Sequence, residues 1–114
     1  MPARDLAFTH LHVHSDYSLL DGTCRLKDLT AKAAHLGMPA VAITDHGVLY
    51  GLISFQQACK DAGIKPIFGC EVYLAPGSHT ERAGKPGADL GHLILLAENE
   101  TGYRNLLKLV SISH

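Results

Sequence analysis

The 114-residue sequence lacks several features that mark specialised classes of protein. Its net charge is −1, which argues against a strongly basic nucleic-acid surface within this chain. No apolar run approaches the roughly 18 residues that a membrane helix needs, and the stretch Met1–Leu6 has no apolar core of a secretory signal. We therefore expect a cytoplasmic protein that does not contact a membrane.

Paired cysteines and the common catalytic loops are missing as well. Cys24, Cys59 and Cys70 are odd in number and far apart, with no Cys-x-x-Cys pair, which predicts reduced thiols. There is no P-loop, no Gly-x-Gly-x-x-Gly motif, no Ser-His-Asp arrangement and no internal repeat. Phosphate-binding loops and serine nucleophiles are thus not the source of any activity.

Hydrophobic residues make up 46% of the chain, which suits about one small domain. Their spacing predicts strands over residues 7–14, 40–44, 65–74 and 92–97. Helices are expected over 26–36, 49–62 and 99 to about 113, and a long loop over 75–91. Strands that alternate with helices imply right-handed crossovers, so we predict an α/β fold with a parallel sheet and flanking helices.

Histidine is abundant, with eight residues, three of which fall within five positions: His10, His12 and His14. Residues two apart on a strand share a face, so the imidazoles of His12 and His14 point the same way. Imidazole is a frequent metal ligand, and such a pair can hold one ion. A polar strand face with hydrogen-bonded histidines is the alternative interpretation.

Further candidate ligands lie at or near the other expected strands. His46 directly follows an apolar strand, His92 opens another, and Glu71 lies inside a third, where a carboxylate is costly to bury without a positive partner. An ion pair of Glu71 with lysine or arginine would also compensate for burial. Asp21 precedes a glycine in a turn-rich stretch and is either a ligand or a surface turn residue.

Several neighbouring residues are given supporting or passive roles. Asp45 could orient a ligand imidazole from behind or cap the next helix. His10 is placed deeper along the first strand, behind the ligands. Cys70 should face away from the metals and pack against the helices. The remaining histidines are expected to be solvated: His35, His79 and His114.

The carboxyl ends of adjacent strands are where α/β folds collect their chemistry, so these residues should converge on one pocket. Mixed nitrogen and oxygen donors suit Zn²⁺, Mn²⁺ or iron, and six ligands exceed the needs of one tetrahedral zinc. Clustered divalent ions promote hydrolysis of phosphoesters. We therefore predict one set of metal-binding and catalytic residues: His12, His14, Asp21, His46, Glu71 and His92.

Two motifs resemble the PHP (polymerase and histidinol phosphatase) superfamily, namely His10–Gly22 and Leu36–Gly47. Two further stretches, Ala62–Gly77 and His92–Leu107, resemble the PHP domain of bacterial replicative polymerase alpha subunits more than histidinol phosphatases. The similarity extends from about residue 5 to residue 114. It marks as metal ligands the same six residues that the spacing selects.

The resemblance implies the N-terminal part of a distorted (β/α)7 barrel that holds up to three zinc or manganese ions and takes part in DNA replication. It implies a phosphoesterase, in some members a 3′–5′ exonuclease, acting with DNA and other replisome subunits. A structural metal-binding module that docks a proofreading partner is the alternative, as is a free-standing PHP phosphatase. An amidohydrolase also begins with His-x-His but needs no Ser-Asp-Tyr-Ser-Leu-Leu-Asp-Gly continuation, so we rank it lower.

The length departs from the family pattern, because a β/α barrel needs roughly 250 residues. The resemblance places the remaining ligands, a Cys and an Asp-x-His pair, beyond residue 114, together with the polymerase domains and their Mg²⁺. We expect an incomplete barrel that is inactive by itself. An open sheet edge and exposed apolar surface should favour self-association of this chain.

Overall fold

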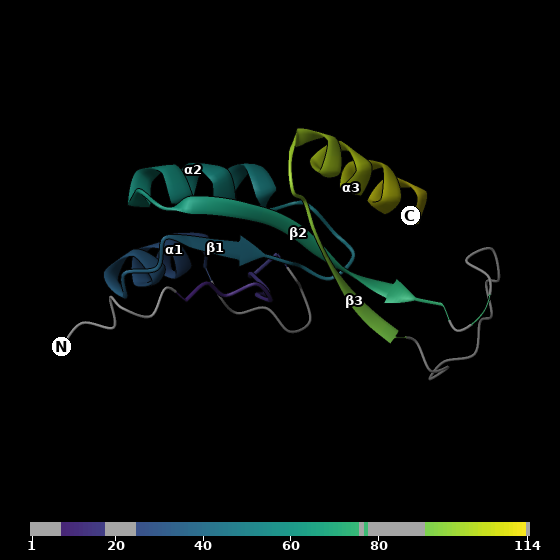
Figure 1. Cartoon of the computed structure of the whole chain (residues 1–114), viewed down its shortest axis with the longest axis horizontal. Coiled ribbons are helices and arrows are strands. Elements are labelled where there is room, and N and C mark those ends of the chain that lie inside the picture. Colours follow the sequence, from purple (N-terminus) through teal and green to yellow (C-terminus); the bar gives the residue numbers. More distant parts are fainter. Residues whose placement is uncertain (1–7, 18–24, 76, 78–90, 114) are drawn as a thin grey trace.

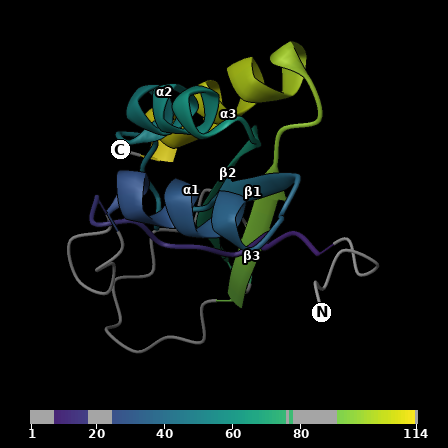
Figure 2. The same ribbon diagram turned by 90° about the vertical axis from the view of Figure 1, so that its left-hand side faces the viewer.

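The computed structural model describes residues 8–17, 25–75, 77 and 91–113 (Figure 1). The three strands lie in one sheet in the order β1-β2-β3, and the helices α1 and α2 pack against each other beside it (Figures 1 and 2). In chain order the elements are α1 (Leu26–His35), β1 (Ala40–Ile43), α2 (Leu52–Ala62), β2 (Lys65–Leu74), β3 (Gly91–Leu96) and α3 (Glu100–Ser113).

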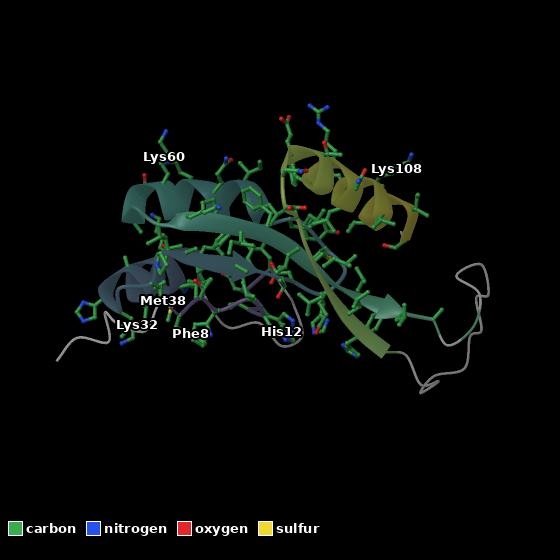
Figure 3. The ribbon with its side chains drawn as sticks, viewed as in Figure 1. Phe8, His12, Lys32, Met38, Lys60 and Lys108 are labelled. Carbon is green, nitrogen blue, oxygen red and sulfur yellow. The ribbon has the colours of Figure 1, made fainter. Side chains whose placement is uncertain are left out.

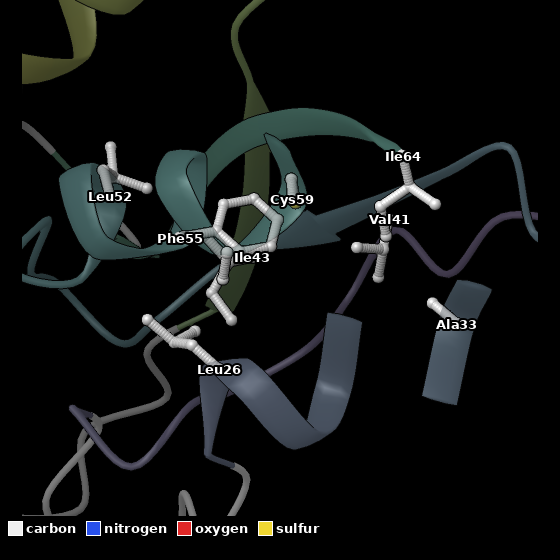
Figure 4. Packing of buried hydrophobic residues seen from close by; sticks show 9 residues of the cluster. Leu26, Ala33, Val41, Ile43, Leu52, Phe55, Cys59 and Ile64 are labelled. Atoms are coloured by element: carbon white, nitrogen blue, oxygen red, sulfur yellow. The ribbon is translucent and has the colours of Figure 1, made fainter. Parts of the chain in front are cut away.

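The core lies between α1, α2 and β1 (Figure 4). Phe55 of α2 is fully buried and meets Val41 and Ile43 of β1 in the same cluster, together with Leu26 of α1. Every residue of β1 is buried, as expected of a short apolar strand that is covered on both faces. This core fixes β1 against the helices and so fixes the position of whatever follows its carboxyl end.

Glycines end the helices α1 and α2, directly after the helical ranges predicted from the apolar spacing. Gly37 and Gly63 have φ angles of +78° and +73°, in the left-handed region that favours glycine. The Met38 and Ile64 amides each donate back to the carbonyl five residues earlier, at 2.9 and 3.0 Å. These are Schellman motifs, which satisfy the last helical carbonyls and turn the chain directly into β1 and β2.

Of the predicted strand over residues 7–14, the structure describes residues 8–14, and these do not form a regular strand. Residues 8–14 run beside β1, where the Ala42 amide donates to the His10 carbonyl at 2.9 Å and the Thr44 amide to the Val13 carbonyl at 2.8 Å. His10 and Val13 are three positions apart, whereas their partners, Ala42 of β1 and Thr44 directly after it, are two positions apart. An extra residue of this kind interrupts a regular ladder, which explains why alternation alone misassigned the segment.

The prediction of an all-parallel sheet is correct for β1 and β2 and wrong for β3. Ala40 to Ile43 pair in parallel with Lys65 to Phe68, across the helix α2. β3 pairs antiparallel with β2, from Gly69 opposite Leu96 to Leu74 opposite Gly91. A parallel neighbour needs a crossover, usually through a helix, and the sequence between β2 and β3 has no helical pattern.

The two faces of the sheet differ in character. Phe68 of β2 packs toward the helices, with ring centroids 6.2 Å from Phe55 and 5.6 Å from Tyr103 of α3. The alternate residues of β2, including Glu71, face the opposite side. Figure 3 shows His12 on this opposite side, while Lys60 and Lys108 point outward from α2 and α3. Within the described ranges no helix is long and apolar enough to cross a bilayer.

Candidate metal centre

The site is built around Glu71, a carboxylate in the middle of β2. Only 4% of its side chain is exposed, whereas Tyr73 two residues further along the strand is 60% exposed. Charged side chains are rarely buried without compensation, because transfer out of water costs several kcal/mol. The surroundings of Glu71 must therefore supply positive charge.

Four imidazoles from separate parts of the chain surround this carboxylate. His46 Nδ1 lies 2.5 Å and His14 Nε2 3.1 Å from Glu71 Oε2, and His12 Nε2 lies 2.9 Å from Oε1. His92 Nδ1 is 3.7 Å from Oε2. Among the described residues the basic side chains within ion-pairing distance of Glu71 are all histidines, so the lysine or arginine partner considered from the sequence is not found there.

The ligand atoms fall into two groups that share Glu71. One contains His12, His14 and Glu71, and the other contains His46, Glu71 and His92. Within each group all the donor atoms lie within 4.8 Å of one another. Each group offers two nitrogens and one oxygen, a donor set suited to zinc or another first-row divalent ion.

The backbone brings His46 and Glu71 together. Beyond the end of β1, His46 forms an isolated parallel bridge with Glu71. The Glu71 amide donates to the Asp45 carbonyl at 3.0 Å, and the Gly47 amide donates to the Glu71 carbonyl at 2.8 Å. Gly47 has a φ of +59°, so a glycine is favoured where the chain turns away from β2.

His92 reaches the cluster because β3 is antiparallel to β2. It lies directly opposite Tyr73, and its ring meets the Tyr73 ring edge-on at a centroid distance of 5.0 Å. Tyr73 also lies nearly parallel to His46, at 6.5 Å. Sequence reasoning missed Tyr73, although its position two residues after Glu71 on a strand was a usable signal.

Of the six predicted ligands, the structure brings five together, and Asp21 lies outside the described residues, as do His79 and His114. His35 is exposed on α1, as expected. His10 is exposed and its ring packs edge-on against Phe8 at 4.8 Å, and its place behind the ligands stays a prediction.

Asp45 lies in the loop that joins β1 to α2, and Cys70 of β2 faces that loop. Asp45 is 3% exposed, and its carboxylate accepts hydrogen bonds from the amide and hydroxyl of Ser15, which adjoins His14. The Cys70 thiol is buried against the carbonyls of Asp45 and Val48, at 3.4 and 3.7 Å. Burial raises the pKa of the Cys70 thiol, which keeps it protonated and suits a packing role.

The surroundings of the Glu71 carboxylate indicate whether a cation fits the site. Its Oε2 atom is buried and, among the described residues, has no partner in hydrogen-bonding geometry, although imidazole nitrogens lie within 2.5–3.7 Å. These imidazole nitrogens lie close to the carboxylate oxygen but are not aligned for hydrogen bonds with it. Such an arrangement is expected where the nitrogens and the oxygen coordinate the same ion. The donor set and this buried oxygen therefore fit divalent metal ions.

The sequence profile of the PHP domain family matches residues 10–114. The chain belongs to the PHP domain family. This PHP chain is 55% identical over 111 residues to DNA polymerase III subunit alpha of Borreliella burgdorferi, which covers 94% of the chain and 9% of that protein. The same subunit of Treponema pallidum is 52% identical over 107 residues, covering 93% of the chain and 9% of that protein. The chain thus spans about a tenth of the length of these curated relatives.

Solved structures share the fold of this PHP chain. An amidohydrolase from Chromobacterium violaceum superimposes with a TM-score of 0.60 at 24% identity, covering 88% of the chain and 32% of that protein. A protein from Bifidobacterium adolescentis assigned as a metal-dependent phosphoesterase also gives 0.60, at 20% identity, covering 90% of the chain and 33% of that protein. These likenesses establish the fold class, a mixed α/β arrangement.

Proposed function

We propose that the histidine cluster around Glu71 binds divalent metal ions and hydrolyses phosphoesters as the PHP module of a bacterial replicative polymerase alpha subunit. The supporting observation is the convergence of four imidazoles on one buried carboxylate. Relatives that match nearly the whole chain include DNA polymerase III alpha subunits. We infer that the substrate is a DNA 3′ end, and that the partners are DNA and other replisome subunits.

Each residue has a distinct part in this proposal. His12, His14 and Glu71 would hold one ion, and His46, His92 and Glu71 would hold another. Asp21 is proposed to complete the set. Zinc or manganese held by these residues would supply a nucleophilic water at neutral pH and charge stabilisation for a phosphoryl displacement.

The exposure of the cluster gives it an open side and a closed side. Glu71 forms the closed side, whereas His12 and His92 are 55% and 51% exposed. We infer that a phosphoester approaches the cluster from the side on which these two imidazoles are exposed. Burial of Glu71 keeps its oxygens out of bulk water, where attraction between a carboxylate and a cation would be screened.

A structural metal-binding module is the second candidate, because the cluster joins distant parts of the chain. The residues come from the segment before α1, the loop after β1, β2 and β3. Ions bound there would cross-link all four, so metal binding would stabilise the fold even without hydrolysis. Docking of a proofreading partner would then be the role of the module.

The first experiment measures metal content by elemental analysis of the purified chain. We expect about two divalent ions per chain, and we expect Glu71→Gln to lose most of both because Glu71 belongs to both groups. Glu98→Gln is the matched control, since Glu98 is exposed and outside either group. Equal metal content in the two variants would defeat the ligand assignment.

The second experiment asks whether the cluster hydrolyses DNA. Residues 10–114 replace the matching segment of the Borreliella burgdorferi subunit, and release of nucleotides from a labelled single-stranded 3′ end is followed with manganese or zinc. We expect Glu71→Gln to reduce release at least a hundredfold while primer extension persists. Bound metal with no release, and a melting temperature that falls on chelation, would favour the structural module instead.

A further inference from the structure

The segment that carries His12 and His14 runs beside β1 without forming a regular strand. Interactions other than regular strand pairing must therefore fix the positions of the two imidazoles. Ordinary strand pairing supplies a backbone bond to every second residue. Here the extra residue breaks that pattern between His10 and Val13. Two backbone hydrogen bonds, from the Ala42 amide to His10 and from the Thr44 amide to Val13, hold the segment, and side-chain hydrogen bonds add to them where the regular pairing is interrupted.

Thr44 supplies the first of these side-chain contacts, on one side of His14. Its hydroxyl accepts a hydrogen bond from the Val13 amide at 3.0 Å and lies 3.3 Å from the Val13 carbonyl, to which it can donate. The Thr44 amide donates to the same carbonyl at 2.8 Å. Thr44 is fully buried, so these bonds do not compete with bulk water.

Asp45 supplies the second side-chain contact, on the other side of His14. Its carboxylate accepts from the Ser15 amide at 2.6 Å and from the Ser15 hydroxyl at 2.7 Å. Ser15 is fully buried and Asp45 is 3% exposed. Hydrogen bonds to an ionised carboxylate are about twice as strong as neutral ones, so this contact fixes the segment firmly.

Asp45 also connects the two parts of the chain that hold the first group of donors. Its side chain binds Ser15, next to His14, while its carbonyl accepts the amide of Glu71 at 3.0 Å. A single residue thereby sets the distance between the His-x-His segment and the carboxylate of β2. The next residue in the chain is His46, which belongs to the second group.

We propose that Thr44, Asp45 and Ser15 form a clamp that positions His12 and His14 against Glu71 and thereby sets the metal affinity of that group. This rests on the proposed metal binding by the cluster. The three clamp residues belong to neither donor group, and they act on the ions through the placement of His14. Residues that orient metal ligands in this way typically change affinity by 10–100-fold when they are replaced.

The test compares Thr44→Val with Thr30→Val in the whole chain. Valine keeps the shape of threonine and removes the hydroxyl. Thr30 is also buried, at 2% exposure, and its hydroxyl also donates to a backbone carbonyl, that of Leu26 at 3.0 Å, but in α1. The pair therefore separates loss of a buried hydroxyl bond in general from loss of the clamp.

Affinity is measured by competition of Zn²⁺ against a chelating indicator, with the visible spectrum of bound Co²⁺ as a second readout. We expect Thr44→Val to weaken binding of one ion at least tenfold and to alter the Co²⁺ spectrum. Thr44→Ser should restore both, because it restores the hydroxyl. Thr30→Val should leave affinity and spectrum unchanged even where it lowers the melting temperature. Equal affinity of Thr44→Val and Thr30→Val would overturn the proposal.

Two additions keep the result decisive. Ser15→Ala removes only one of the two bonds to Asp45, so it tests the other half of the clamp should Thr44→Val fail to fold. Imidazole nitrogen NMR spectra, recorded without metal, report the placement of His12 and His14 directly. If the native chain binds no metal, the proposed function fails. The placement of the imidazoles by the clamp is then judged from these spectra, and identical spectra for Thr44→Val and the native chain would overturn it.

Discussion

The burial of Cys59 makes the free energy of unfolding depend on pH. Its thiol is fully buried in the core beside Phe55, and burial raises its pKa from 9.0 to about 11. The folded chain therefore retains this proton at pH values where the unfolded chain has lost it. The contribution is present in full below about pH 9 and is lost as the pH rises toward 11.

We expect the free energy of unfolding to fall between pH 9 and 11. Of this decrease, on the order of 2 kcal/mol is due to Cys59. Urea denaturation at several pH values measures the slope. Cys59→Ala serves as the comparison, because lysine and tyrosine titrate in the same range and contribute equally to both proteins. Parallel curves for the two proteins would show that this thiol is not protected in the fold.

The individual site residues differ in how visible they are in the sequence. Glu71 stands out because it is the one charged residue of an apolar strand after Lys65, and the His-x-His pair stands out by its spacing. The roles of Ser15 and Thr44 are not visible, because each depends on a partner about 30 residues away that only folding brings near. Tyr73 was overlooked because tyrosine is an ordinary strand residue.

At the scale of elements, hydrophobic period and glycine placement predict where helices and strands lie. The bounds of β2 are as predicted, and both Schellman glycines fall where the apolar pattern ends. Strand direction is a different matter, since it depends on the path of the connecting chain. The segment before β3 carries no helical pattern, and the antiparallel pairing of β3 follows from that more readily than the parallel one we expected.

A substitution at Gly69 of β2 tests how closely the neighbouring strands approach this position. A Cβ atom there would lie 2.6 Å from the Leu95 carbonyl oxygen and 2.9 Å from Cγ2 of Thr44. Such overlap forces backbone movement, so we expect Gly69→Ala to lower the free energy of unfolding by about 1–3 kcal/mol. Because Thr44 is one of the displaced neighbours, zinc affinity should fall as well.

Gly91→Ala is the control for this substitution within the same sheet. A Cβ atom at Gly91 would meet Leu74 at 3.5 Å, which is ordinary van der Waals contact. We expect its denaturation curve to lie within about 0.5 kcal/mol of the native one, as is usual away from crowded positions. Equal destabilisation by the two alanines would mean that the strands are not as close as the structure places them.

At the scale of the whole molecule, apolar surface is left open on β3 and α3. In the described part of the chain β3 is an edge strand, and Leu93 and Leu96 are each about 40% exposed. On α3, Ile112 is 67% exposed. An apolar edge strand without charge is a template for pairing with another chain, so we expect the isolated chain to associate as its concentration rises.

The strand edge and the helix surface predict different outcomes when a charge is introduced. Leu93→Lys places an ammonium group on β3, which natural sheets use to block edge pairing, whereas Ile112→Lys places the same charge on α3. Sedimentation velocity over a range of concentrations should show a smaller species for Leu93→Lys and no change for Ile112→Lys. The reverse would assign association to the α3 surface through hydrophobic contact. Because His92 adjoins Leu93, zinc affinity measured on the same samples would show whether the strand edge and the metal cluster are coupled.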